Sequence, residues 1–280
     1  MNKIIAAFDG LKFSEVTLTC AIDLARKSKG HLVGISLEDA TYRGFALDDV
    51  IDQKGFSEAK MKQLMKEDEK KRKLSSMRFE EICREAHIPY TIHHDKKIAL
   101  RELLHESIYA DLLIIDSRET LTKFHEKLPT RFIGDLLSSL QCPVLLVGRE
   151  YQPVQKVALL YDGGTSSVYA IKMFGYLAGE LKDLPVDIVT VTRDGKKLSS
   201  DDTELMDELV KRHFPQTKYI SLKGEPEETL IHHLKNQEKN TLVVVGAYQR
   251  GAASRWLHPS IADALTVHLK NPLFIAHNKG

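Results

Sequence analysis

Thr241-Leu-Val-Val-Val-Gly246 opens the stretch that decides the fold, and Asn271-Pro-Leu-Phe-Ile-Ala276 closes it after a loop and an amphipathic segment. The stretch has a counterpart earlier in the chain. There, Leu112-Leu-Ile-Ile-Asp-Ser117 and Cys142-Pro-Val-Leu-Leu-Val147 stand in the same order, and the two copies align without a gap at an offset of 129 residues, from Cys142 to Asn271. The sequence therefore indicates that the chain is a duplication.

The length and composition fit two compact domains. A chain of 280 residues exceeds the usual single-domain size, and each half is long enough to bury a core of its own. Charged residues make up 28% and the formal net charge is +1, so bulk electrostatics predict neither nucleic-acid nor membrane binding. We expect a first domain over residues 1–148, a linker over 149–155 and a second domain over 156–280.

Two further features of the sequence concern the cellular location and the state of the cysteines. The apolar run from Ile4 to Phe8 is too short for a signal peptide, and no apolar stretch reaches the roughly 20 residues of a transmembrane helix, so a cytoplasmic location is expected. The three cysteines, Cys20, Cys83 and Cys142, lack the Cys-x-x-Cys spacing of a zinc or redox motif, and they are predicted to be buried thiols.

Short apolar runs alternate with amphipathic segments in both halves, which is typical of parallel strands joined by helices. We therefore predict an α/β fold with two doubly wound parallel sheets of five strands each. The predicted strands span residues 4–8, 31–37, 88–93, 112–115, 143–147, 157–161, 186–191, 219–222, 241–246 and 271–276.

Residues 38–86 contain most of the extra length of the first half. No period appears over 38–55, which predicts a long loop. Residues 57–86 lack Gly and Pro and predict a helix, on which scattered apolar residues form a discontinuous stripe: Met61, Leu64, Leu74, Met77 or Met65, and Ile82. The charge run 67–73 is too polar to be buried, and its mixed signs indicate a solvated helix face rather than a binding patch.

Candidate ligand residues lie at the predicted carboxyl ends of strands, where open parallel sheets bind ligands. Asp9-Gly10 and Asp162-Gly163 end the first strand of each half, and Gly246 and Gly251 flank the loop after the fourth strand of the second half. Ser260 stands near the start of the next helix. A glycine-containing loop that leads into a helix can present backbone N–H groups to a phosphate.

These residues resemble the universal stress protein family in its tandem two-domain form, and the resemblance covers essentially the whole chain. The matching pieces are the Asp-Gly-x-x-x-Ser openings at Asp9 and Asp162, the segment Gly224-Glu-Pro-Glu-Glu-Thr-Leu-Ile, and the Cys142-Pro-Val and Asn271-Pro-Leu starts of the last strands. The resemblance implies Rossmann-like, adenine nucleotide alpha hydrolase-like domains that pair through their last strands as an internal pseudo-dimer. It also implies a role in stress survival and, in some members, adenine-nucleotide binding; a homodimer of whole chains stays open.

The nucleotide-binding motif of that family, Gly-x2-Gly-x9-Gly-[Ser/Thr], is degenerate in both halves. The second half keeps Gly246 and Ser260 but has Gln249 and Pro259 at the other two positions, and the first half has no glycine in the corresponding segment 117–131. We therefore expect ATP, ADP, AMP or another small anion in the second domain only. By the same resemblance Asp9 and Asp162 lie by the base-binding part of the pocket, while capping of the following turn is an equal alternative.

Rival interpretations remain. The absence of a Gly-x-Ser-x-Gly elbow and of a Gly-x4-Gly-Lys-[Ser/Thr] loop favours binding over catalysis, although Asp9 with Asp116 could support weak ATP or phosphoester hydrolysis if the two carboxylates meet. Neither His93-His94 nor His232-His233 has chelating spacing, so no metal is expected. The alternative to a ligand-binding protein is a scaffold that contacts a protein partner through the charged helix 57–86.

Overall fold

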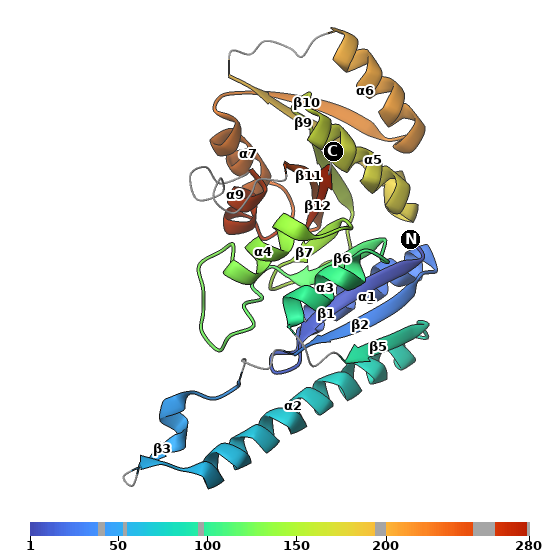
Figure 1. The fold of residues 1–280 in the computed structure, drawn as a ribbon. Helices are drawn as coiled ribbons and strands as arrows, with labels where there is room; N and C mark the ends of the chain where they lie inside the picture. The colour runs from blue at the N-terminus through green and yellow to red at the C-terminus, as the bar shows by residue number, and fades with distance from the viewer. Residues whose placement is uncertain (39–42, 53–54, 95–97, 194–199, 249–260, 279–280) are drawn as a thin grey trace.

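The computed structural model describes residues 1–38, 43–52, 55–94, 98–193, 200–248 and 261–278 (Figure 1). Over these residues the main element is a ten-stranded sheet in the order β10-β9-β8-β11-β12-β7-β6-β1-β2-β5. Its strands are β1 Lys3–Asp9, β2 His31–Leu37, β5 Tyr90–His94, β6 Leu112–Asp116, β7 Val144–Val147, β8 Lys156–Leu160, β9 Val186–Thr192, β10 Thr217–Lys223, β11 Thr241–Tyr248 and β12 Leu273–Asn278.

Each half contributes five parallel strands in the same order, with its first strand between its second and fourth. The halves meet where β12 runs antiparallel to β7, with Leu273 opposite Leu146 and Ile275 opposite Val144. The fold class and the pairing through the last strands are thus confirmed. The two predicted sheets are joined into one continuous sheet.

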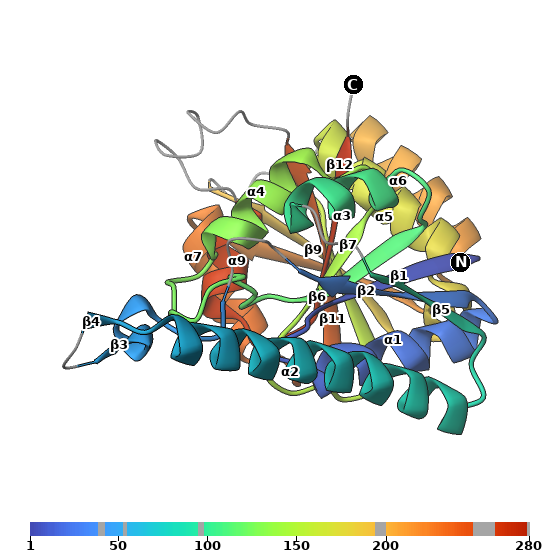
Figure 2. The same ribbon diagram turned by 60° about the horizontal axis from the view of Figure 1, so that its bottom comes forward.

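Helices cover both faces of the sheet (Figures 1 and 2). Buried residues of α1, α2, α5 and α6 pack on one face, and those of α3, α4, α7 and α9 pack on the other. Their bounds are α1 Glu15–Ser28, α2 Glu58–Glu85, α3 Ala99–Ser107, α4 Arg131–Ser139, α5 Thr165–Leu177, α6 Ser200–His213, α7 Pro226–Lys235 and α9 Ile261–His268, with short 3-10 helices η1 Leu47–Val50 and η2 Gly179–Asp183.

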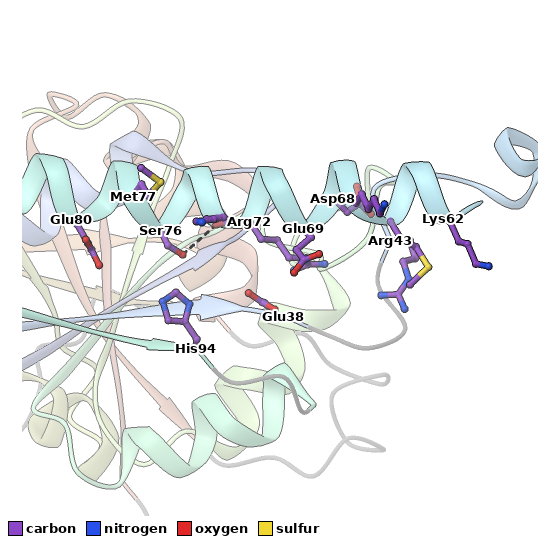
Figure 3. A pocket seen from close by; sticks show the side chains of 13 residues that line it. Glu38, Arg43, Lys62, Asp68, Glu69, Arg72, Ser76, Met77, Glu80 and His94 are labelled. Atoms are coloured by element: carbon purple, nitrogen blue, oxygen red, sulfur yellow. Dashed lines mark hydrogen bonds between the residues drawn. The ribbon is translucent and has the colours of Figure 1, made fainter. Parts of the chain in front are cut away.

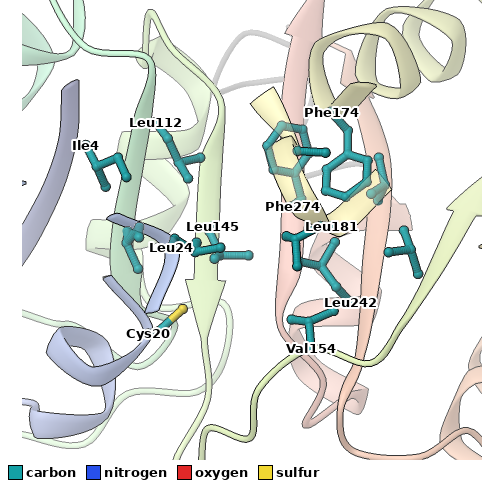
Figure 4. Close-up of a cluster of buried hydrophobic side chains, with 14 of the residues drawn as sticks. Ile4, Cys20, Leu24, Leu112, Leu145, Val154, Phe174, Leu181, Leu242 and Phe274 are labelled. Carbon is teal, nitrogen blue, oxygen red and sulfur yellow. The ribbon is translucent and has the colours of Figure 1, made fainter. Parts of the chain in front are cut away.

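The hydrophobic core runs across the joint between the halves. One cluster of buried side chains includes Leu112 and Leu145 from the first half and Phe174 and Phe274 from the second (Figure 4). Since burial of apolar surface is the main driving force of folding, this shared cluster couples the two halves energetically. The domain boundary near residue 148 stays a prediction, although Val154 of the expected linker also lies in this cluster.

Local sequence explains several element ends. The Ser14 hydroxyl accepts the backbone N–H of Thr17 and caps α1, which ends at Lys29 in the left-handed conformation, at φ 53°. Pro226 occupies the first turn of α7, where its missing N–H costs no helical hydrogen bond. The three cysteines are free and buried as predicted, and burial raises the pKa of the Cys83 thiol to about 12.

The structure of residues 38–86 differs from two predictions. The expected loop contains η1 and a two-stranded hairpin, β3 Ile51–Asp52 with β4 Gly55–Phe56. The helix is present as α2, but the predicted apolar stripe is wrong, because Leu74, Met65 and Met77 are exposed.

The sequence pattern did not predict which residues of α2 face the sheet. Phe79 and Cys83 are fully buried, and the Phe79 ring fits against β2 because Gly34 has no side chain there. Asp68 is also buried, contrary to the expectation for the charge run, because its carboxylate accepts the backbone N–H of Gly44 at 2.8 Å. The rest of the charge run is solvated, except for the half-buried Arg72.

Candidate functional site

The predicted site residues fall at two places on the sheet, one in each half. In the first half β1 lies between β2 and β6, and in the second half β8 lies between β9 and β11. These are the points where the strand order reverses, which is where open parallel sheets hold ligands. We call the residues around Asp9 and Asp116 the first-half site, and those around Asp162 and Gly246 the second-half site.

Asp9 and Gly10 are enclosed. Asp9 is 0% exposed, and its Oδ1 accepts the backbone N–H of Leu11 at 2.8 Å. Helix α2 covers the next residue, because the Ser75 hydroxyl donates to the Gly10 carbonyl at 2.8 Å, and a Cβ at Gly10 would lie 3.1 Å from Arg72 Cγ. Asp9 therefore caps the turn that follows β1, and α2 covers this turn.

Asp116 ends β6 and is held by the next turn of the chain. The Arg118 guanidinium donates through Nε to Asp116 Oδ1 at 2.9 Å and through Nη2 to Oδ2 at 2.6 Å. The Ser14 hydroxyl donates to the same carboxylate at 3.3 Å, and Asp116 is only 8% exposed. Two-point pairing of this kind is strong and directional, and it raises the pKa of Arg118. The positive charge that balances Asp116 thus comes from the protein itself.

Glu119 is a buried carboxyl group with a raised pKa that the sequence analysis did not identify. It is 9% exposed, and its Oε1 accepts the backbone N–H groups of Thr120 and Leu121, both at 2.9 Å. Burial, followed by the negative charge of Asp9, raises the pKa of Glu119 to about 7.

No local signal marks Glu119 in the sequence. The residue belongs to a polar loop, and its burial depends on distant partners, such as Thr130, whose hydroxyl donates to the Glu119 carbonyl and caps α4 by accepting the N–H of Ile133. Thr130 falls at a position of the degenerate nucleotide motif, so the hydroxyl there serves the loop and the helix start in this half.

The second-half site repeats the turn of the first half, and the aspartate on this turn differs in exposure. Asp162 is exposed, and its Oδ1 accepts the N–H of Gly164 at 2.8 Å and the hydroxyl of Ser167 at 2.6 Å. Gly163 adopts a φ of 81°, which favours glycine, and Gly164 is the N-cap of α5, which therefore has no side-chain cap. Asp162 Oδ2 accepts no hydrogen bond from any residue within the described ranges.

Gly246 has a structural role that is independent of any ligand. A Cβ at this position of β11 would lie 2.3 Å from the Ser166 carbonyl oxygen and 2.7 Å from the Ser167 nitrogen. The first turn of α5 therefore packs directly on the strand backbone, which only glycine permits. The survival of this glycine is explained by packing, and it does not by itself point to a phosphate.

The remaining predicted residues of this site, Gly251 and Ser260, lie outside the described residues, as do Gln249 and Pro259. The site is therefore described by Asp162, Gly163 and Gly246 alone. Their role as ligand-binding residues stays a prediction.

The described histidines form no metal-binding group, and one of them lies beside a glutamate. His93 Nδ1 lies 2.7 Å from Glu106 Oε1, an ion pair with α3 when the ring is protonated. Within the part of the chain that the structure describes, no three His, Cys, Asp or Glu side chains are placed to hold a metal ion. No described helix has the length and apolar character needed to cross a bilayer.

Comparison with solved structures places this architecture among known folds. A universal stress protein from Archaeoglobus fulgidus DSM 4304 superposes with a TM-score of 0.69 at 15% identity, covering 99% of this chain and 98% of that one. A functionally unknown protein from Pseudomonas aeruginosa PAO1 gives 0.57 at 13% identity, with 99% and 92% covered. A protein from Pseudomonas aeruginosa UCBPP-PA14, provisionally classed as a universal stress protein, gives 0.54 at 14% identity, with 99% and 93% covered.

Sequence comparison adds nothing to this. No model of a protein family matches the chain, and no curated protein matches it either. The structural likeness extends over both halves and both lengths, and at this level of identity it shows the fold. The chain has the fold of the universal stress proteins.

Proposed function

We propose that the chain is a universal-stress-protein-like binding protein that holds an adenine nucleotide, or another small anion, at the second-half site. The observation that carries the proposal is the contrast between two equivalent residues. Asp162 is exposed with one carboxylate oxygen directed to no described donor, whereas Asp9 is fully buried in a cluster of its own chain.

The second-half residues suit the two ends of a nucleotide. Asp162 Oδ2, which accepts no hydrogen bond from a described residue, can accept one from a ribose hydroxyl or an adenine amino group. The Gly163-Gly164 turn leads into the uncapped first turn of α5, whose N–H groups and positive helix end favour an anion. This assignment agrees with the expectation of a ligand in the second domain only.

Binding without catalysis is the favoured mode. A hydrolase built on Asp9 and Asp116 would need one of these carboxylates to reach the substrate. Asp9 is fully buried and Asp116 is paired with Arg118, so the geometry supports a structural role for both.

Calorimetric titration with ATP, ADP and AMP tests the proposal, with a thermal shift measured in parallel. We expect heat of binding for at least one nucleotide at millimolar concentration and at least a tenfold loss of affinity in Asp162→Asn, because the amide cannot accept as strongly as the carboxylate. Asp9→Asn is the matched control and should leave affinity unchanged. No heat and no thermal shift with the wild type, or equal losses in both variants, would refute the proposal.

A scaffold function is the second candidate, and one observation favours it. The β3–β4 hairpin lies at the far end of α2, away from the main sheet (Figures 1 and 2), and its Phe56 is 60% exposed with Ile51 exposed beside it. Deleting α2 would remove Phe79 from the core, so a double variant Ile51→Ser, Phe56→Ser is the cleaner test. Loss of a captured protein partner in this variant would support the scaffold; unchanged capture would dismiss it.

A further inference from the structure

The hairpin and the start of α2 project from the main body. We call η1, the hairpin and the first turns of α2, residues 47–52 and 55–66, the arm. It lies in the extra length of the first half and extends past the edge of the ten-stranded sheet (Figures 1 and 2). The exposed side chains of the arm are therefore held away from the sheet, where a second molecule can reach them.

Contacts within the chain hold the arm in shape. The Ser57 N–H donates to the Val50 carbonyl at 2.9 Å, and Val50 is only 1% exposed. Lys123 Nζ lies 3.6 Å from Asp49 Oδ2, which ties η1 to the loop that precedes α4. A surface that is ordered before it binds loses little conformational entropy on binding.

The tip of the arm exposes two large apolar side chains beside an acidic one. Ile51 and Phe56 stand directly opposite each other in the antiparallel hairpin, so they lie on one face of it. They are 51% and 60% exposed, and Asp48 is exposed on η1. Asp48 forms no ion pair with any described residue. The tip therefore suits a surface that is both apolar and basic.

A groove of about 920 Å³ runs along α2 and begins at the arm. Figure 3 shows Arg43 and Lys62 at the arm end of the groove, and Glu38, Glu69 and Glu80 further along it. The lining of the groove thus changes in charge along its length. Its arm end is basic, and its carboxylates lie beyond that end.

Four residues of α2 give the arm a self-complementary face. Glu58, Lys62, Met65 and Lys66 stand at i, i+4, i+7 and i+8, so they share one face of the helix. Glu58 and Lys62 pair at 2.7 Å, but both side chains are mostly exposed, and such a pair contributes little to stability. Met65 is exposed, and Lys66 forms no ion pair with a described residue. With an acid at one end and a base at the other, this face complements a copy of itself turned end for end.

We propose that the arm binds the arm of a second copy of this chain, so that the protein forms a twofold dimer. The second arm then places its Ile51 and Phe56 against Met65 of the first, and its Glu58 beside Lys66. Glu58 and Lys66 are eight residues apart, about 12 Å along the helix axis, so the same pair forms once on each side of the twofold axis. The dimer requires neither the nucleotide of the second-half site nor a different protein partner.

Sedimentation equilibrium of the full chain tests the proposal between about 1 μM and about 500 μM, a range that brackets a weak association. We expect the mass to rise from 31.7 kDa toward twice that value and then to stop rising. Because the contact is small, a Kd on the order of 50 μM is expected. Raising the salt concentration from about 50 mM to about 500 mM should weaken the dimer roughly fivefold or more, because salt screens exposed charges.

The double variant Ile51→Ser, Phe56→Ser tests the tip. It should weaken the dimer roughly tenfold or more, because serine cannot bury the same apolar surface against the second copy. Leu74→Ser is the matched control, since Leu74 is a 53% exposed apolar residue of α2 that belongs to neither the arm nor the groove lining. It should leave the Kd unchanged. All three side chains are more than half exposed, so the variants should fold, and thermal unfolding checks this.

Charge reversal tests the pairing of Glu58 with Lys66. Glu58→Lys and Lys66→Glu should each weaken the dimer roughly tenfold, because each places like charges opposite one another. The double variant Glu58→Lys, Lys66→Glu should restore the Kd to within about threefold of the wild type. Residues eight positions apart on one helix do not contact each other, so this rescue reports a contact between copies. Lys71→Glu reverses an exposed lysine of α2 outside the groove and is the matched control.

Three results would overturn the proposal. They are a constant mass of 31.7 kDa up to about 500 μM, a dimer that Ile51→Ser, Phe56→Ser leaves unchanged, and no rescue in the charge-reversed double variant. A monomer that captures a different protein through the tip would support the scaffold instead. Titration of AMP into the Ile51→Ser, Phe56→Ser variant should match the wild type, so the dimer and the nucleotide site are tested separately.

Discussion

Asp9 and Asp162 occupy the same place in the two halves and have opposite surroundings. Asp9 is buried beside a group of polar residues at the end of β6, whereas Asp162 stands exposed on its turn. The difference follows the sequence at an offset of 129 residues: Asp116, Arg118 and Glu119 of the first half correspond to Val245, Ala247 and Tyr248 of the second. One fold position thus carries a cluster of charged residues in the first half, whereas the corresponding sequence positions of the second half carry no charged residue.

The largest effect should come from a side chain at the glycine of the second half. Gly246→Ala would bring Cβ to 2.3 Å from the Ser166 carbonyl oxygen, and relieving this contact must separate β11 from α5. We expect a loss of about 3 kcal/mol in the free energy of unfolding, measured by denaturant titration. The first half has Ser117 at this position, so Ser117→Ala is the matched control and should change stability by less than about 0.5 kcal/mol.

The next effect concerns the pH dependence of the first half. The unfolded chain releases the Glu119 proton near pH 4.5, and the folded protein holds it to about pH 7, because the raised pKa of Glu119 reflects burial beside Asp9. The contribution of Glu119 is therefore most favourable below pH 4.5, declines as the pH rises to about 7, and stays low above that. The total change is roughly 3 kcal/mol.

Glu119→Gln should remove this dependence. The stability of the variant relative to the wild type should increase between about pH 5 and about pH 8, because the amide does not ionise. Unfolding curves at a series of pH values measure the difference. A constant difference across this range would show that Glu119 is not held protonated in the folded protein.

A smaller loss is expected from Arg118→Ala, which removes the guanidinium from Asp116. Because Arg118 is partly exposed and water can replace some of its contacts, we expect a loss of about 2 kcal/mol, less than for a fully buried pair. Denaturation at neutral pH measures it. Asp116→Val, which copies Val245 of the second half, should recover stability when added to Arg118→Ala; a further loss would contradict the account of the cluster.

The smallest effect on stability should come from Asp162→Ala, which removes the acceptor for the Gly164 N–H and the Ser167 hydroxyl. Loss of such a cap at an exposed position costs about 1 kcal/mol. Thermal unfolding checks the value. A loss above about 3 kcal/mol would indicate that Asp162 is as important for stability as a buried residue such as Asp9. The proposed difference between the two aspartates would then not hold.

The sequence predicted the strands, the long helix and the order of both halves, because these depend on apolar runs and local periodicity. It could not predict the surroundings of buried polar groups. Asp68 and Glu119 are polar residues in polar stretches. Their surroundings come from residues that are distant in the sequence: Gly44 donates to Asp68, Thr130 donates to the Glu119 carbonyl, and the charge of Asp9 acts on the Glu119 carboxyl. Gly246 was recognised as special, and the role that the structure describes for it is packing against α5.

Amide chemical shifts during a titration with AMP test the central contrast most directly, because they report on both halves of one molecule. The account predicts shifts at residues 162–167 and 246, and none at residues 9–14 and 116–119. Equal shifts in both halves, or shifts confined to the first half, would contradict it.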